Sequence, residues 1–404
     1  MKKSENNWQF ILLCCLVYFT SYMTRYNYSS IVNEMVNSMG LEKSVVGFSL
    51  TLSFITYGVG QLVSGYLGDK ISPRKLIAMG LLVTACCNIA VGTVSSIYVI
   101  YVIWALNGFA QAFLWPPLVK IMIHTIAKEK YGKANSYVIT ASQVATVLVY
   151  VLASICAAFA SWNVLFFICG TLAVIVSAVW LLSTKDIKEP EPIVKTAESK
   201  EDGGKKLTVG GLILSAGLIP ILIAIVMQGM IRDGITAWVP SYITEEFNLS
   251  VESSILTSSI LPVFAILSVG VTRWLRNRCK TELHTTILLW GISIACAVGL
   301  LIFHESQMIV SVLLMALMTA CAHGINLMLI CDLPARFVKY GNVSFASGLL
   351  NSCTYIGSAL STYGIALLSD EFGWNTTIIA WCAIAVVGLL TCVFATKKSS
   401  IIKD

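Results

Sequence analysis

The chain alternates long apolar stretches with short polar loops. Its hydrophobic residues run for roughly 20 positions or more at a time, the length that an α-helix needs to cross a bilayer. The pattern therefore predicts an all-α polytopic membrane protein with twelve spans. The alternation that marks a transmembrane β-barrel does not occur. The predicted spans begin near Trp8, Ser44, Arg74, Ile97, Lys133, Ser161, Gly210, Val251, Leu283, Gln307, Asn342 and Gly373.

One long polar stretch interrupts this pattern near the middle of the chain. Residues 184–208 have mixed charge, two prolines and a pair of glycines, a composition typical of a flexible linker. Six predicted spans lie on each side of it. We therefore expect an N-terminal six-helix bundle over residues 1–183, a cytoplasmic linker over 184–208 and a C-terminal six-helix bundle over 209–404.

Composition and charge support a membrane location. Of the 404 residues, 57% are hydrophobic and 12% are charged, whereas a soluble domain has about 25% charged residues. With the N-terminus inside, the predicted inner loops are rich in lysine and arginine. The predicted outer loops are acidic, and Lys43 is their one lysine or arginine. This asymmetry predicts cytoplasmic termini and a multi-pass protein of the cell (plasma or inner) membrane. The net charge of +6 then reflects topology, so we expect no nucleic-acid partner.

Two arginines stand inside apolar spans at matching places in the two halves. Arg25 precedes Asp69, at the end of the second span, by 44 positions, and Arg232 precedes Arg273, at the end of the eighth, by 41. A guanidinium in hydrocarbon is costly, so it normally faces a polar cavity and binds a ligand. Its planar donors fit a phosphate or carboxylate. The pair predicts one anion bound by both halves; the alternative is that each arginine reaches to a membrane interface.

The sequence shows no enzyme motif. It lacks a nucleophile elbow, a phosphate loop and a dinucleotide fingerprint. The thirteen cysteines are scattered without metal-binding spacing, so we expect them to pack as small apolar residues, with no metal and no cofactor. Residues Met1 to Asn7 precede a long apolar segment without an evident cleavage site, and we expect this segment to remain as the first span.

Other polar or aromatic residues in the spans are candidates for binding or gating. Tyr18, Tyr22 and Tyr57 can offer hydroxyls to a substrate or simply pack, and Trp115 begins a Trp-Pro-Pro sequence that should break the fourth span. Asp233 follows Arg232 directly, so we expect it to point elsewhere and make a polar helix contact. His323 is expected to be a satisfied residue of the bundle.

Charged pairs near the predicted inner ends of two equivalent spans suggest a gate. Lys120 and His124 lie one turn apart on the fourth span, as do Asp332 and Arg336 on the tenth. We expect Lys120 and Asp332, which have opposite charges, to meet when the inner side closes. A solvated inner face is the alternative.

The first inner loop resembles the signature of the major facilitator superfamily. In GYLGDKISPRK, which runs from Gly65 to Lys75, a glycine is followed four residues later by Asp69 and then by basic residues that include Arg74. The resemblance implies the major facilitator fold of two pseudo-symmetric six-helix bundles, and it assigns Asp69 and Arg74 to gating rather than to cargo.

Within that superfamily the chain resembles the organophosphate:phosphate antiporters. The first span has Arg25-Tyr26-Asn27, the fourth has NGFAQAFLWPP (residues 107–117), and the seventh has the pattern R-x-G-I-x-x-W-x-P-x-Y from Arg232 to Tyr242. The similarity extends to Tyr57 and Tyr355. It implies an organophosphate exchanged for inorganic phosphate by alternating access, with both arginines as ligands of the phosphate.

Three positions depart from the pattern of the glycerol-3-phosphate transporter. Gln61 stands where that family member has a lysine, Ser142 (or Gln143) where it has a histidine, and Gly229 where it has a tyrosine. We interpret these as a thinner phosphate cradle with room for a larger organic group, and we keep Gln61 and Ser142 as candidate ligands.

Three functions remain open from the sequence. The first is the antiporter, a monomer in the lipid bilayer whose two arginines make the empty carrier slow to turn around. The second is a proton-coupled symporter of an organic acid, for which Asp233, Asp332, His124 and His323 supply titratable groups. The third is a membrane sensor of a sugar phosphate.

Overall fold

The computed structural model describes residues 8–67, 71–185, 218–333 and 343–398, and within these ranges every regular element is a helix. The first half contains α1 (Trp8–Met39), α2 (Lys43–Leu67), α3 (Pro73–Thr93), α4 (Ile97–Gln111), α5 (Trp115–Thr125), α6 (Lys128–Phe159) and α7 (Trp162–Ser183). The second contains α9 (Ile219–Phe247), α10 (Val251–Ser258), α11 (Ile260–Arg276), α12 (Glu282–Phe303), α13 (Met308–Asn326), the π-helix η1 (Leu327–Asp332) and α14 (Val343–Lys398).

Apolar length accounts for most of these helices. Nine of the described helical segments are long and apolar enough to cross a membrane. In this count α4 with α5, α10 with α11, and α13 with η1 each form one segment, and α14 counts once although Gly373 breaks its helical backbone. The helices α1 and α2, of 32 and 25 residues, also have the length of a span but are not among the nine. The all-helical membrane fold is thus confirmed, and the count of twelve spans stays a prediction.

Local sequence signals set several helix ends. Ser72 caps α3 by accepting a hydrogen bond from the Lys75 amide at 3.3 Å, and Pro73 occupies the first helical position, where an amide proton is not needed. Asn248 ends α9 in the left-handed conformation, with φ of 51°. Gly373, with φ of 75°, supplies the turn inside α14 that a residue with a side chain adopts at a cost.

The fourth predicted span is broken where the sequence predicts it. The helix α4 ends at Gln111, three residues form a tight turn, and α5 begins at Trp115. In the turn the amides of Ala112, Phe113 and Leu114 bond to carbonyls three residues back. Pro116 and Pro117 cannot donate backbone hydrogen bonds, so the ladder of α4 cannot continue through them.

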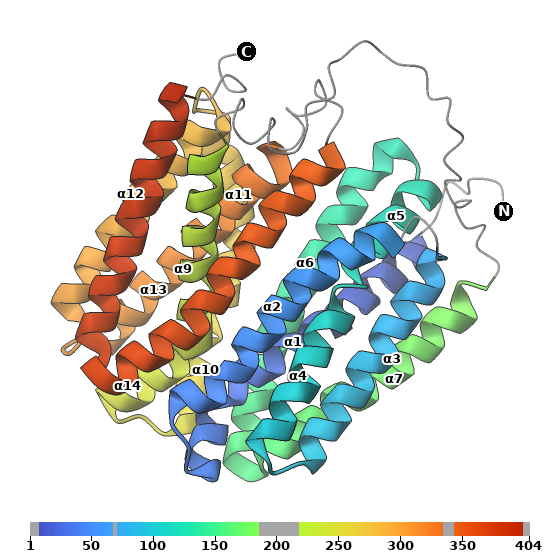
Figure 1. Cartoon of the computed structure of the whole chain (residues 1–404), viewed down its shortest axis with the longest axis horizontal. Coiled ribbons are helices and arrows are strands. Elements are labelled where there is room, and N and C mark those ends of the chain that lie inside the picture. The colour runs from blue at the N-terminus through green and yellow to red at the C-terminus, as the bar shows by residue number, and fades with distance from the viewer. Residues whose placement is uncertain (1–7, 68–70, 186–217, 334–342, 399–404) are drawn as a thin grey trace. The chain divides into compact units, whose positions relative to one another are not determined.

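The chain separates into two compact units, coloured along the sequence in Figure 1. Unit 1 comprises Met1–Ala197 with Ser250–Pro262, and unit 2 comprises Glu198–Leu249 with Val263–Asp404. In unit 1, α1 packs on α6 and α7, and α3 packs on α7. In unit 2, α9 packs most extensively on α14, with α13 on another side. The predicted linker at 184–208 lies, beyond Lys185, outside the described residues, and the predicted domain limits stay a prediction.

Candidate functional site

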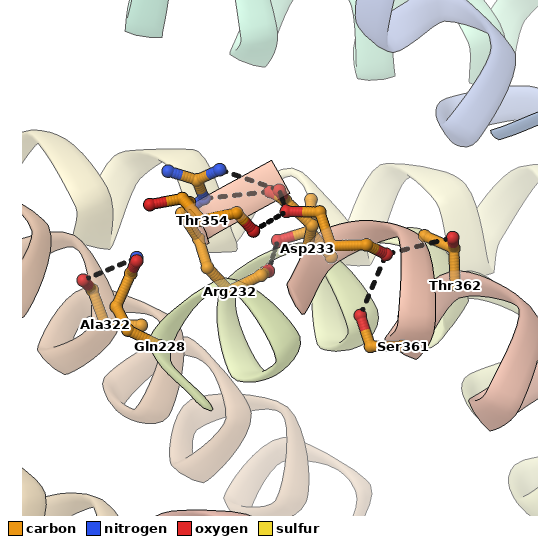
Figure 2. A network of polar contacts seen from close by, with 9 residues as sticks. Gln228, Arg232, Asp233, Ala322, Thr354, Ser361 and Thr362 are labelled. Atoms are coloured by element: carbon orange, nitrogen blue, oxygen red, sulfur yellow. Dashed lines mark hydrogen bonds and ion pairs between the residues drawn. The ribbon is translucent and has the colours of Figure 1, made fainter. Parts of the chain in front are cut away.

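Arg232 and Asp233 form a buried ion pair in the middle of α9. The guanidinium donates from Nε to Asp233 Oδ1 at 2.9 Å and from Nη2 to Oδ2 at 2.7 Å, as Figure 2 shows. Arg232 is 8% exposed and Asp233 3% exposed. The expectation that Asp233 points away from Arg232 is therefore wrong, because the long arginine side chain folds over to reach the neighbouring carboxylate. The expected polar contact between helices is present, since Ser358 of α14 donates from Oγ to Asp233 Oδ2.

Close packing of α9 on α14 fixes this pair. A Cβ atom at Gly229 would overlap the Thr354 carbonyl, and one at Gly357 would overlap the Val226 carbonyl, so both glycines allow the two backbones to touch. The interpretation of Gly229 as room for a larger substrate group is thus wrong. Any side chain at position 229 would meet the backbone of α14 at Thr354.

The rest of the seventh-span motif also holds helices together. The Trp238 indole donates to the Thr362 carbonyl at 2.9 Å, and the Tyr242 hydroxyl donates to the His304 carbonyl at 2.9 Å. A Cβ at Gly234 would press on Ile365 and Ser361. The aromatic and glycine residues of the motif therefore hold α9, which carries Arg232, against its neighbours.

Two further polar residues lie near the ion pair. Gln228, one turn before Arg232, donates from Nε2 to the Ala322 carbonyl of α13 at 3.1 Å. The residue after Ala322 on that helix, His323, is close enough to Arg232 and Asp233 to interact electrostatically with both. Gln228 is not among the residues that the sequence predicts for the site, although an amide in an apolar span one turn from an arginine is a usable signal.

Arg25 in unit 1 has aromatic surroundings. Its guanidinium carbon lies 4.3 Å from the ring centre of Tyr57 and 5.7 Å from those of Phe54 and Tyr26. Such contacts stabilise a cation away from water and hold the plane of the guanidinium in place. The structure thus brings together Arg25 and Tyr57, which the sequence assigns to one site.

A buried amide network holds α1 where it carries Arg25. Gln111 accepts from the Ser21 hydroxyl at 2.6 Å and donates to the Thr24 hydroxyl at 2.9 Å. One turn further along α1, Asn27 donates to Asn88 of α3 at 2.7 Å. These residues are not among those that the sequence predicts for the site, because a sequence does not show which polar residues of different spans meet.

An aromatic row on α1 continues from Arg25. The rings of Tyr18 and Tyr22 are 5.0 Å apart, those of Tyr22 and Tyr26 are 5.3 Å apart, and Trp115 of α5 lies 4.6 Å from Tyr18. The predicted residues Tyr18, Tyr22 and Trp115 are therefore neighbours, and each is partly exposed. Such a surface can pack against the organic part of a ligand.

The remaining predicted ligands are less well placed. Gln61 is partly exposed and makes a long 3.5 Å hydrogen bond to the Ala112 carbonyl. Ser142 is fully buried, and its hydroxyl donates to the Ile139 carbonyl of its own helix at 2.7 Å, whereas Gln143 is partly exposed. Tyr355 is 9% exposed on α14, next to Thr354. Their roles as ligands stay predictions.

Three of the predicted gating residues lie within the described part of the chain. Arg74 donates to the Leu181 carbonyl at 2.5 Å and the Thr184 hydroxyl at 3.0 Å, and so caps the end of α7. Asp332 pairs with Arg273 of the same unit, with Nη1 and Oδ2 2.5 Å apart. Lys120 is partly exposed on α5. Asp69 and Arg336 lie outside the described residues.

The comparisons with known proteins agree on the class. The family model of the Major Facilitator Superfamily matches residues 14–362. The chain belongs to this superfamily, and the relatives and structural neighbours described below are membrane transport and sensor proteins, not enzymes.

Relatives of named function are distant but match almost end to end. A "Probable hexose phosphate transport protein" of Chlamydia muridarum is 22% identical, over 96% of this chain and 91% of its own. The glycerol-3-phosphate transporter of Bacillus subtilis is 24% identical, over 91% of this chain and 88% of its own. The membrane sensor protein UhpC of Escherichia coli is 22% identical, over 90% and 86%.

Solved structures show the same fold. A bacterial homologue of the human lysosomal transporter Spinster superposes with a TM-score of 0.79 at 11% identity, and 98% of each chain is covered. The peptide transporter POT gives a TM-score of 0.77 at 14% identity, with 97% of this chain and 95% of that chain covered.

Proposed function

We propose that the protein is a secondary transporter that exchanges a small organophosphate for inorganic phosphate by alternating access. The observation that carries this proposal is an arginine at equivalent places of the two repeats, Arg25 and Arg232, each held by specific partners within a long helix. The relatives named for hexose phosphate and glycerol 3-phosphate support a phosphate ester over a carboxylate.

In this proposal each arginine binds the anionic group of the substrate, and the residues around the arginines select its organic part. A phosphate monoester carries a charge of about −1.5 to −2 near neutral pH, and a guanidinium binds such a group with two parallel hydrogen bonds. The aromatic row of Tyr18, Tyr22 and Trp115 would contact the organic part. The carrier works as a monomer in the cell membrane, with both termini in the cytoplasm.

A second function has support of its own. The similarity to membrane sensor proteins covers 89% and 90% of the chain, close to the 91% that the similarity to the glycerol-3-phosphate transporter covers. A sensor would bind the same ester and would not carry it across the bilayer.

One reconstitution experiment separates these functions. Purified full-length protein in liposomes with trapped inorganic phosphate should take up labelled phosphate, and external glycerol 3-phosphate, hexose phosphates or phosphoglycerate should compete when they are substrates. A sensor gives no uptake, although esters raise its thermal stability by binding the folded state. A proton-coupled symporter gives uptake into phosphate-free liposomes that depends on an imposed pH gradient.

A further inference from the structure

Asp233 occupies the edge of Arg232 that an oxyanion would use. A phosphate or carboxylate binds a guanidinium best through two parallel N–H···O bonds. Asp233 already makes this pair of bonds, with Nε and Nη2 at 2.9 Å and 2.7 Å. The substrate of the proposed function would therefore meet an arginine that is engaged by a carboxylate of its own chain.

We propose that Asp233 is an internal competitor of the substrate. It neutralises Arg232 in the empty carrier, the anionic group displaces it, and Asp233 then takes up one proton. The inference rests on the proposed function only in taking Arg232 as a ligand of the anion.

Because Arg232 is buried, it needs a negatively charged partner both before and after phosphate replaces Asp233. A buried guanidinium without a counter-charge is strongly destabilising, so Asp233 stabilises the empty state. A bound phosphate takes over that role, and an ionised Asp233 beside it would repel it through a medium that screens poorly. A proton taken up from bulk water removes this repulsion. One O–H bond forms on the carboxylate, and no other covalent bond changes.

The groups around Asp233 are compatible with a neutral carboxyl. From α9 it faces Arg232, and from α13 the imidazole of His323 lies within electrostatic range. From α14 it faces the Ser358 hydroxyl, which donates to the ionised form and can rotate to accept from the protonated form. Tyr355 and Cys353 are further ionisable side chains of the same stretch of α14.

The test compares phosphate binding by the wild type and the Asp233→Asn variant, which keeps the shape of the side chain and loses its charge. Dissociation constants for inorganic phosphate are measured on full-length protein in detergent across the range from about pH 8 to about pH 5, where carboxylates begin to protonate. We expect the variant to bind phosphate about tenfold more tightly near pH 8, a typical size for coupling between two ligands of one group. The ratio of the two constants should fall toward one as the pH falls.

The ratio separates Asp233 from the titration of the ligand. Phosphate itself titrates in the same way in both measurements, so its contribution cancels in the ratio. Ser358→Ala gives an independent measurement, because it removes a hydrogen bond that favours the ionised carboxylate. As the pH is lowered, the dissociation constant for phosphate should begin to fall at a higher pH in Ser358→Ala than in the wild type.

The possible outcomes are distinct. Weaker or unchanged phosphate binding by Asp233→Asn, in a wild type that binds phosphate, would show that Asp233 only positions Arg232 and would overturn the inference while the proposed function stands. A wild type that binds neither phosphate nor any phosphate ester would overturn both. When Asp233→Asn does not fold, an unchanged pH profile in Ser358→Ala overturns the inference.

Discussion

Arg25 and Arg232 have different chemical partners. Arg25 lies against the aromatic ring of Tyr57, and Arg232 is paired with the carboxylate of Asp233. An aromatic face attracts a cation but does not cancel its charge, whereas the carboxylate does. In the empty carrier, Asp233 thus offsets the charge of Arg232.

Arg25→Lys should weaken phosphate binding about tenfold or more. Lysine keeps the charge, but it loses the planar fork and most of the stacking on Tyr57. The measurement is the dissociation constant of inorganic phosphate on purified protein, with labelled phosphate exchange in liposomes as a second readout.

The matched control for this prediction is Arg278→Lys. Arg278 also stacks on an aromatic ring, with its guanidinium carbon 3.8 Å from the centre of Trp274, but it lies exposed beyond the end of α11. The control variant should bind phosphate as the wild type does. Equal affinities for all three proteins would mean that Arg25 does not contact the anion.

At the scale of elements, the contact between α9 and α14 determines the geometry of the Arg232 pair. Gly229 and Gly357 let the two helix backbones touch close to the level at which Ser358 reaches Asp233. A shift of either helix would separate the hydroxyl from the carboxylate. The glycines therefore act on the site although neither has a side chain to place in it.

Gly357→Ala should destabilise the protein by about 1–3 kcal/mol, the usual cost of adding a methyl group where there is no space. Gly364→Ala on the same helix is the control, because a Cβ there meets nothing within 4 Å. It should be neutral or stabilise by roughly 0.5–1 kcal/mol. Thermal unfolding in detergent measures both, and a Gly357→Ala midpoint equal to that of Gly364→Ala would contradict the packing argument.

The sequence predicts features that depend on neighbouring residues better than features that depend on residues far apart in the chain. Hydropathy is local along the chain, so it locates the spans, and the prolines after Trp115 locate the break between α4 and α5. Which helices touch depends on residues far apart in sequence. For that reason the sequence alone leads to the wrong expectation for Gly229 and Asp233, and it gives no signal for the contacts of Gln111 and Asn88.

The pairing of Asp332 shows the same limit. The sequence suggests Lys120 as its partner, whereas Arg273 holds it within unit 2. A contact with Lys120 stays a prediction for a closed inner gate, and it would have to compete with this existing pair. The Arg273 pair and the Lys120 contact predict that different charge reversals restore function.

We expect Asp332→Arg to impair phosphate exchange and Arg273→Asp added to it to recover much of the loss, because the pair is rebuilt with its charges reversed. Arg278→Asp added to Asp332→Arg is the control, since Arg278 is an exposed arginine of the same region and contacts Trp274 instead. Rescue by Lys120→Asp with Asp332→Lys, and none by the Arg273 reversal, would instead favour the gate contact.

At the scale of the whole molecule, the question is whether the carrier can cross the membrane empty. The expectation of strict exchange rests on two arginines without counter-charges, which would make an empty, closed carrier costly. Asp233 neutralises one of these charges. Exchange should therefore be faster than net uptake, but its advantage should depend on Asp233 and not on the arginines alone.

Liposomes with trapped phosphate and phosphate-free liposomes measure this advantage directly. For the wild type we expect faster uptake of labelled phosphate into the loaded vesicles and slow but measurable uptake into the empty ones. In Asp233→Asn the empty carrier leaves Arg232 without its carboxylate, so its return is hindered and the ratio of exchange to net uptake should rise several-fold, within the range of typical coupling. The loaded vesicles serve as the control for the amount of active protein, because both kinds of vesicle receive the same preparation. A ratio that stays equal in both proteins would mean that Asp233 plays no part in the return of the empty carrier.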